Sequence, residues 1–229
     1  GACYYLNKKN NKFLKNIYLG QAISDKVINK KDILKSINNK SKIHIEENCN
    51  HAKIAKLLNK GEIISIARGR EEFGARALGN RSIVANPSID GIVQKINEQI
   101  KNRDFWMPFA LTILDKKHKE FIVNEKNIIS DFMTIGFNTK IKNYKKIING
   151  IHPYDKTIRP QILRREFNPN YYSIIDEFYK ISKIPGVLNT SLNLHGSPIS
   201  STLKDICHTF ENSGLNYLYL DDKFLIKKI

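Results

Sequence analysis

The sequence predicts an α/β domain in which helices flank a twisted, mixed β-sheet. Short apolar runs typical of strands alternate along the chain with segments whose apolar residues recur at helical spacing, and this alternation favours the α/β class. The chain has 229 residues and is 41% hydrophobic, which is enough to bury a core in one large or two small domains. No internal repeat is apparent in the sequence, so a solenoid or a propeller is not indicated.

Several segments combine helical periodicity with residues that begin or end helices. In chain order they are residues 31–37, a helix capped by Asn48 or Asn50 and closed by Gly61, a helix that follows Ser88 and runs to Ile100, a helix that begins at Asn168 or Asn170 and continues to Ile181, and residues 202–212.

Short apolar runs between these helices are expected to form the strands of the sheet. They are residues 42–46, 63–67, 83–85, 109–114, 132–137, 187–190, 217–220 and 223–227. Residues 138–149 are basic and rich in turn formers, so we expect a surface loop there, and Asp221 and Asp222 are expected to form a turn between the last two strands.

The stretch between two of these strands is rich in arginine and glycine, and we name residues 68–82 the arginine loop. It carries Arg68, Arg70, Arg76 and Arg81 in a chain that elsewhere uses mostly lysine for positive charge. Clustered guanidinium groups repel one another unless an anion lies among them, because arginine stays protonated and its planar donors match phosphate or carboxylate. The glycines of the loop let backbone N–H groups approach the same anion. A solvated surface turn is the alternative.

A second basic pair follows the amphipathic helix that precedes residue 101. Lys101 and Arg103 stand between this helix and a strand, so both can point toward the arginine loop. The alternative is a solvated helix end, where cations are favourable. His152 precedes a proline, and a histidine in that position is most often a turn residue.

A polar run closes the predicted strand at residues 187–190. Asn189, Thr190, Ser191 and Asn193 carry hydroxyl and amide groups that can donate to and accept from a phosphate, a ribose or a urea-like group. An ordinary Asx turn is the alternative.

The run GREEFGARALGNRSIVANP, residues 69–87, closely resembles the signature of the NodU/TobZ-like carbamoyltransferases, at the start of their C-terminal, YrdC-like domain. The resemblance continues at residues 97–110, 152–161 and 188–198, in the family's order, and covers nearly the whole chain. It implies a YrdC-like fold, a twisted mixed sheet with flanking helices.

The resemblance also implies a reaction, in which carbamoyl phosphate and ATP are joined into a carbamoyl-adenylate, with Mg²⁺ expected beside ATP. The residues expected to stabilise the developing phosphoryl charge are Arg70, Arg76, Arg81, Lys101 and Arg103. The residues expected to bind substrate or nucleotide, or to orient the arginines, are Arg68, Glu72, Asn80, His152, Arg159, Asn189, Thr190, Ser191 and Asn193. No metal-ligand set is expected in the chain itself.

The sequence departs from the family pattern at two places. Met107 stands where the family has an arginine, which bears on phosphate affinity and on activity. Asp155 comes one residue later than the family's aspartate, whereas His152 and Arg159 match the pattern well.

The resemblance divides the chain into residues 1–47, expected to be the tail of an actin-like domain with a connector, and residues 48–229, the YrdC-like domain. The actin-like domain, which we expect to be missing or on a separate chain, would pass the carbamoyl group to a hydroxyl of a sugar or natural product. The chain is therefore expected to be part of an O-carbamoyltransferase used in biosynthesis.

The chain has 38 Lys and Arg against 22 Asp and Glu, a formal net charge of +16. This excess permits nucleic acid as a partner, so a basic YrdC-like nucleic-acid-binding module is one alternative function, and a degenerate partner subunit is another. Nucleic acid is the less favoured partner, because the arginines cluster in a glycine-rich loop. No apolar run is long enough to cross a membrane, and the three cysteines are too far apart to suggest a disulfide framework, so we expect a cytoplasmic protein.

Overall fold

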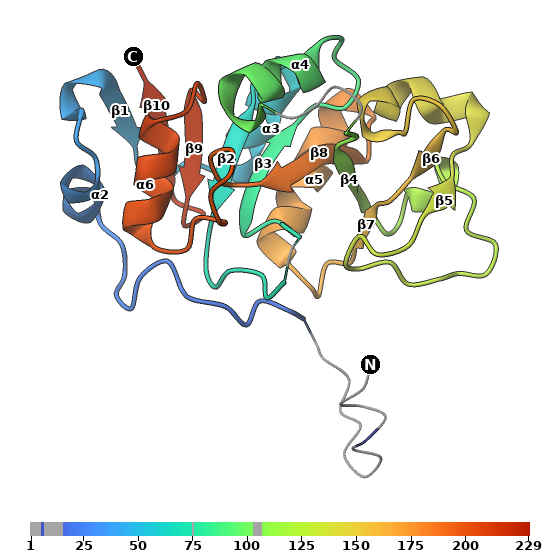
Figure 1. The fold of residues 1–229 in the computed structure, drawn as a ribbon, viewed down its shortest axis with the longest axis horizontal. Coiled ribbons are helices and arrows are strands. Elements are labelled where there is room, and N and C mark those ends of the chain that lie inside the picture. The colour runs from blue at the N-terminus through green and yellow to red at the C-terminus, as the bar shows by residue number, and fades with distance from the viewer. Residues whose placement is uncertain (1–5, 7–15, 75, 103–106) are drawn as a thin grey trace.

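The computed structural model describes residue 6 and residues 16–74, 76–102 and 107–229 (Figure 1). Its strands are β1 (Ile43–Glu46), β2 (Ile64–Ala67), β3 (Arg81–Ala85), β4 (Ala110–Leu114), β5 (Phe137–Asn138), β6 (Thr157–Ile158), β7 (Gln161–Leu163), β8 (Gly186–Ser191), β9 (Tyr217–Leu220) and β10 (Phe224–Lys228). Its α-helices are α2 (Lys30–Ser36), α3 (His51–Asn59), α4 (Ile92–Ile96), α5 (Pro169–Ser182) and α6 (Leu203–Glu211).

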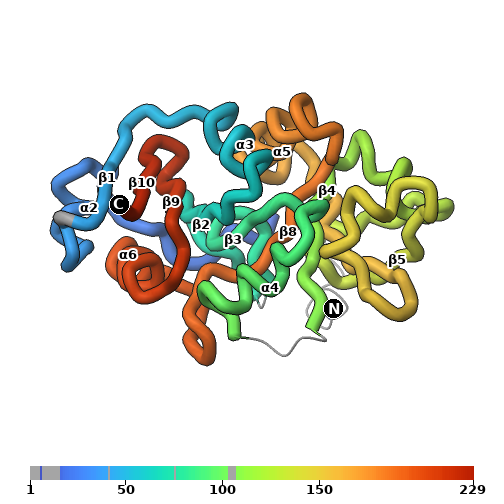
Figure 2. Tube along the Cα trace, turned by 90° about the horizontal axis from the view of Figure 1, so that it is seen from above, coloured from blue at the N-terminus to red at the C-terminus, as the bar shows by residue number. Residues whose placement is uncertain are grey.

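Eight of the strands form one sheet in the order β1-β10-β9-β2-β3-β8-β4-β7, and β5 pairs with β6 separately. Neighbouring strands are antiparallel except for the parallel pairs β2–β9 and β4–β7, so the expected mixed sheet is confirmed. Viewed from above, α3 and α5 lie on one side of this sheet and α6 lies on the other (Figure 2). The arginine loop connects β2 to β3, as the sequence predicts.

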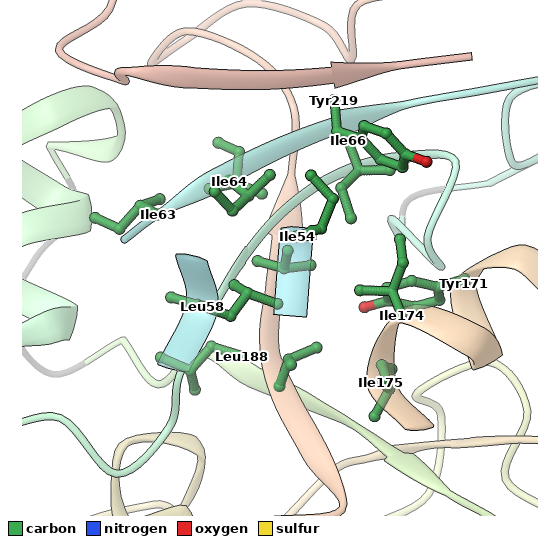
Figure 3. Close-up of a cluster of buried hydrophobic side chains, with 14 of the residues drawn as sticks. Ile54, Leu58, Ile63, Ile64, Ile66, Tyr171, Ile174, Ile175, Leu188 and Tyr219 are labelled. Carbon is green, nitrogen blue, oxygen red and sulfur yellow. The ribbon is translucent and has the colours of Figure 1, made fainter. Parts of the chain in front are cut away.

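One part of the core lies between the sheet and the pair of helices α3 and α5 (Figure 3). Ile54 and Leu58 of α3, Ile64 of β2, and Ile174 and Ile175 of α5 are all fully buried. In both helices the apolar side chains recur at helical spacing, so each helix has an apolar face, and that face packs against the sheet. Burying each such side chain contributes roughly 1.5–3 kcal/mol.

Polar side chains fix where the three longer helices begin. The side chain of Asn50 accepts from the backbone N–H of Lys53 at 2.9 Å and caps α3. Asn168 caps α5 by accepting from the N–H of Tyr171 at 3.1 Å, and Thr202 forms a capping box with Asp205 at the start of α6. One of the two candidate caps is therefore observed at each of the first two helices, and the helix predicted at residues 202–212 is confirmed with a capping box at its start.

The helix expected directly after Ser88 begins later than predicted. The N–H and hydroxyl of Ser88 both donate to Asn86 Oδ1, at 3.0 and 2.9 Å, which holds residue 88 in a turn. Gly91, with φ of 73°, takes the cap position of α4 instead. The helix then continues as a π-helical segment, η2 (Asn97–Lys101), which ends at Asn102.

The region between β4 and α5 departs most from the predicted elements. Only Phe137–Asn138 is a strand where one is predicted at 132–137. The loop expected at 138–149 is largely the 3₁₀ segment η4 (Ile141–Gly150), whose Ile147 is fully buried. Two further 3₁₀ segments, η1 (Lys40–Lys42) and η3 (His118–Glu120), and the short strands β6 and β7 are also not predicted.

Residues 30–46, ahead of Asn48, pack onto the same fold. Strand β1 pairs with β10 at the edge of the main sheet, and Ile33 of α2 and Ile37 are buried in the core. The expected division at residues 47 and 48 remains a prediction about domain origin, while the packing continues across it. None of the described helices is both long and apolar enough to cross a bilayer.

Candidate active site

A cavity of about 280 Å³ opens where the arginine loop, β4, β8 and the segment before β7 meet. It is lined by Arg76, Ala77, Pro108, Phe109, Ala110, Met133, Gly150, His152, Thr157, Ile158, Arg159, Asn189, Thr190 and Ser191. None of these described lining residues is acidic. The cavity therefore brings together six residues expected from the sequence and offers an anion several donors without a competing carboxylate in its lining.

Two guanidinium groups give the cavity its charge. Arg76 comes from the arginine loop and Arg159 from the segment between β6 and β7, and both line the cavity. Burial lowers the pKa of Arg76, and the positive charge of Arg159 lowers it further. Both cations line the same cavity, and an anion bound there would relieve their mutual repulsion.

Lys101 stands behind one wall of the cavity, at the end of η2, and its side chain is almost fully buried. Its Nζ atom donates to Ser191 Oγ at 3.2 Å, to Asn193 Oδ1 at 2.7 Å and to the Asn193 carbonyl at 3.3 Å. Ser191 lines the cavity, and together with Asn193 it also lines an adjoining hollow of about 460 Å³. The hydroxyl of Ser191 accepts from Lys101 and donates to Asn193 Oδ1 at 2.6 Å, so the ammonium group is held directly behind a lining residue of the cavity.

A tight turn positions the residues from 152 to 159. Asp155 Oδ1 accepts from the N–H and the hydroxyl of Thr157, at 2.9 and 2.7 Å, and lies 3.1 Å from His152 Nδ1. The hydrogen bonds from Thr157, followed by the neighbouring His152, lower the pKa of Asp155. Asp155 therefore stabilises the turn that brings His152 and Arg159 to the cavity, and it does not line the cavity itself.

Arg81 requires a correction, because its side chain is fully buried on backbone carbonyl groups. Its guanidinium makes six hydrogen bonds of 2.6–3.3 Å, which use all three nitrogen atoms. The acceptors are the carbonyl oxygens of Gln21, Arg68, Gly69, Asn80 and Ser201. The expected contact of Arg81 with phosphate does not fit this geometry, since its donors close the arginine loop upon itself.

Arg68 and Arg70 of the loop do not line the cavity either, so their expected places at the phosphate or nucleotide do not fit this geometry. Arg68 is buried, pairs with Asp222 at 2.9 Å and lies 6.0 Å from the ring centres of Tyr171 and Tyr219. Arg70 is exposed and donates to the carbonyl of Leu19 at 2.7 Å. Arg103 lies outside the described residues.

Glu72 and Asn80 hold the arginine loop in shape. Glu72 Oε1 accepts from the N–H groups of Leu78 at 2.6 Å and Asn80 at 2.7 Å, and burial raises the pKa of this carboxyl. Asn80 Nδ2 donates to the carbonyl of Arg70, and its Oδ1 accepts from Asn168. Both residues order the loop that carries Arg76, and neither lines the cavity.

Several lining residues are not among those expected from the sequence. Thr157 lies within the run at 152–161, and Phe109 and Ala110 within the run at 97–110, so the motifs contained a signal for all three. Met133 belongs to a segment expected as a strand, and nothing in its sequence context marks it. Met107, which replaces the family arginine, is 45% exposed and directly precedes Pro108 of the cavity wall.

Comparison with known proteins finds relatives that match most of this chain. The chain is 38% identical over 220 residues to the protein MJ1051 of Methanocaldococcus jannaschii, covering 94% of this chain and 41% of the relative. It is 33% identical over 189 residues to the nodulation protein NolNO of Sinorhizobium fredii, covering 81% of this chain and 28% of that protein. The chain thus spans well under half the length of these relatives.

Two solved structures share the fold. Full-length HypF in its phosphate- and nucleotide-bound form matches with a TM-score of 0.54 and 17% identity, over 76% of this chain and 25% of HypF. YciO of E. coli matches with a TM-score of 0.52 and 15% identity, over 74% of this chain and 76% of YciO. The YrdC-like fold is thereby confirmed.

The model of the family described as "Carbamoyltransferase C-terminus" matches residues 55–228, which include the arginine loop, Lys101, the turn at 152–159 and the polar end of β8. All the elements that build the cavity thus fall within one family match, and the chain belongs to the carbamoyltransferase C-terminal family.

Proposed function

We propose that this domain binds carbamoyl phosphate and ATP at the cavity and forms a carbamoyl-adenylate, as the activating half of an O-carbamoyltransferase. The observation that carries the proposal is the pair Arg76 and Arg159 in a lining whose described residues include no acid, with Lys101 behind Ser191. Phosphoryl groups carry the charge that such a donor set stabilises. A cavity of about 280 Å³ suits a small phosphorylated molecule better than a polymer.

The proposed reaction has two steps. Water cleaves carbamoyl phosphate into carbamate and inorganic phosphate. A carbamate oxygen then attacks the α-phosphorus of ATP, a phosphorus–oxygen bond forms, and the bond to the β-phosphate breaks as pyrophosphate leaves. Negative charge grows on the phosphoryl oxygens during the second step, and Arg76, Arg159 and Lys101 stabilise it without having to reorient.

The residues that the structure describes do not include a carboxylate cage for magnesium. Among the described residues no group of three histidine, cysteine, aspartate or glutamate side chains lies close enough to hold a metal ion. The Mg²⁺ expected with ATP does not fit a protein-held site here, and we assign no step to it. Phosphate oxygens and water are the ligands that Mg²⁺ takes when it accompanies a nucleotide.

We assign the second half of the reaction, transfer to a hydroxyl of a sugar or natural product, to the actin-like domain that the sequence resemblance implies. The chain alone should therefore release pyrophosphate from ATP only when carbamoyl phosphate is present, and it should modify no acceptor. Mass spectrometry after incubation with a panel of sugar and aminoglycoside hydroxyl compounds checks this division. A carbamoylated acceptor formed by this chain alone would contradict it.

Binding is tested by titration calorimetry with carbamoyl phosphate and ATP. Arg76→Gln and Arg159→Gln should each weaken carbamoyl phosphate binding by about 10-fold or more, because each removes charge-assisted hydrogen bonds. Arg165→Gln is the matched control, since Arg165 is exposed, lies over the ring of Tyr172 and does not line the cavity. Equal affinities of the wild type and Arg76→Gln would remove the cavity from the proposal.

A further inference from the structure

Residues 16–23 lie along the arginine loop, and we name them the strap. In Figure 1 this blue segment passes beside the loop between β2 and β3. Four backbone hydrogen bonds of 2.7–3.2 Å join the strap to the first half of the loop. With the donor named first, they run from Gly20 to Glu71, from Ile23 to Gly69, from Glu71 to Gln21 and from Phe73 to Ile17. An antiparallel bridge between Ala22 and Arg70 lies among them, so the strap pairs with the loop much as a strand pairs with its neighbour.

Two arginines of the loop that do not line the cavity bind the strap instead. Arg70 Nη2 donates to the carbonyl of Leu19 at 2.7 Å. Arg81 Nη2 donates to the carbonyl of Gln21 at 3.3 Å, as one of the six hydrogen bonds described above. Hydrogen bonds from a charged donor are about twice as strong as those between neutral groups. The strap therefore gives a role to two arginines that the cavity leaves unused.

The strap also contacts the loop beyond Arg76. The hydroxyl of Tyr18 donates to the carbonyl of Leu78 at 2.9 Å. Leu78 directly follows Ala77, which lines the cavity together with Arg76. Contacts with the strap thus precede Arg76 at residues 69–73 and follow it at Leu78. One segment holds both ends of the turn that brings Arg76 to the cavity.

The arginine loop needs such support because its own backbone is permissive. Gly69 and Gly74 both have positive φ, of 43° and 128°. Glycine loses more conformational freedom on ordering than any other residue, so a loop that contains several glycines is costly to hold in one conformation. The hydrogen bonds to the strap offset part of this cost, and they fix where Arg76 stands.

We propose that the strap is a positioning element of the cavity, with Tyr18, Arg70 and Arg81 as positioning residues, and that its docking on the arginine loop is coupled to the binding of carbamoyl phosphate. The inference rests on the proposed function and deepens it. A ligand that binds only when Arg76 is in place also binds only when the strap is docked. Each event then favours the other by the same factor.

Hydrogen exchange of the whole chain, labelled briefly and read by mass spectrometry, tests the coupling. The amides of Gly20 and Ile23 report on the docked strap, because both donate to the loop. With carbamoyl phosphate at about ten times the dissociation constant found by calorimetry, their exchange should slow by about 11-fold. The amides of α2, a helix that packs on α6, should slow less.

The outcomes of this measurement separate the inference from the proposed function. Equal slowing at the strap and at α2, or no slowing at the strap, would overturn the inference and leave the proposed function intact. Failure of the wild type to bind carbamoyl phosphate would overturn both.

Arg70→Met distinguishes a positioning role from direct contact with the ligand. Arg70 is exposed, so its replacement should leave the fold intact. Without ligand, the strap should exchange about 5-fold faster than in the wild type, the factor expected for one lost hydrogen bond, and Arg70→Lys should recover part of the protection. Direct contact with phosphate would instead weaken carbamoyl phosphate binding and leave the exchange of the free chain unchanged. That result would overturn the role of Arg70.

Gly20→Pro tests whether undocking the strap weakens binding. The change removes the N–H that donates to Glu71, and a Cβ at this position would lie 2.1 Å from Cγ of Glu71. Because only the docked fraction binds, the affinity for carbamoyl phosphate should fall by about 5-fold or more. Val27→Ala is the matched control, since Val27 follows the strap closely and is 86% exposed. Wild-type affinity in Gly20→Pro, with the strap exchanging freely, would overturn the coupling, and the wild-type exchange measurement decides the matter if this variant does not fold.

Discussion

Replacing Arg81 should destabilise the fold far more than it changes the chemistry of the cavity. A hydrogen bond to a charged group contributes about 1.5–3 kcal/mol, so the six bonds of Arg81 would sum to about 9–18 kcal/mol, which is comparable to the whole stability of a domain, about 5–15 kcal/mol. The loss of hydration of the buried guanidinium offsets most of that sum. Removing one partner from a buried charged cluster costs about 3–5 kcal/mol, so we expect Arg81→Met to lower the free energy of unfolding by about 4 kcal/mol.

Urea denaturation followed by circular dichroism measures this loss. Arg81→Lys should recover only part of it, because an ammonium group lacks the forked geometry that reaches five carbonyl groups at once. Arg76→Met is the matched control: Arg76 is exposed in the same loop, and its replacement should change stability by less than about 0.5 kcal/mol. Wild-type stability in Arg81→Met, together with weakened phosphate binding, would refute this reasoning and return Arg81 to the site.

Three further predictions concern stability and activity. Burial lowers the pKa of His51, so the unfolded chain takes up the proton more readily than the folded chain. The free energy of unfolding must therefore fall as the pH drops below about 6.5 toward the folded pKa. The variant His51→Gln should lose less stability than the wild type between pH 7 and pH 5 in the same denaturation assay, and parallel pH profiles would contradict this. Gly79 has φ of 112°, and an added Cβ would lie 2.2 Å from Cδ1 of Tyr171, so Gly79→Ala should lower the free energy of unfolding by about 2–4 kcal/mol. At Gly91 nothing lies within 4 Å of an added Cβ, so Gly91→Ala should lower it by only about 1–2 kcal/mol. Equal losses would show that the contact with Tyr171 is readily relieved. Met107→Arg should raise the rate of carbamoyl phosphate-dependent pyrophosphate release by adding a cation beside Pro108, and an unchanged rate would show that residue 107 does not face the reacting phosphates.

The elements that the sequence predicts well are those fixed by neighbouring residues. Asn50, Asn168 and Thr202 cap helices through bonds to residues three positions further along the chain, so a short window contains the whole interaction. Strand β7 has only three residues and exists because it pairs with β4, which lies some fifty positions earlier. The buried Ile147 in η4 likewise depends on distant partners. A local pattern cannot contain these contacts.

The arginine loop shows the same limit at the level of the site. Arg76 and Arg81 lie five positions apart in one motif, and both guanidinium groups are equally able to bind phosphate by residue type. Their roles separate because the carbonyl groups of Gln21 and Ser201 accept hydrogen bonds from Arg81, while Arg76 lines the cavity together with Arg159. The sequence resemblance predicts a site at the scale of the loop, and only the packing of remote segments distinguishes the two side chains.

Because the chain is synthesised from its N-terminus, the arginine loop leaves the ribosome before the distant residues that contact it. Asn189 reaches back 112 positions to Ala77, and Ser201 reaches back 120 positions to Arg81. Such long-range contacts slow folding, because a large loop must close before they form. On the ribosome, the loop emerges well before the strand and the carbonyl group that hold it, so its guanidinium groups remain in water during that interval. A nascent chain arrested before residue 201 should accordingly carry a protease-sensitive arginine loop, even where its first helices have already formed.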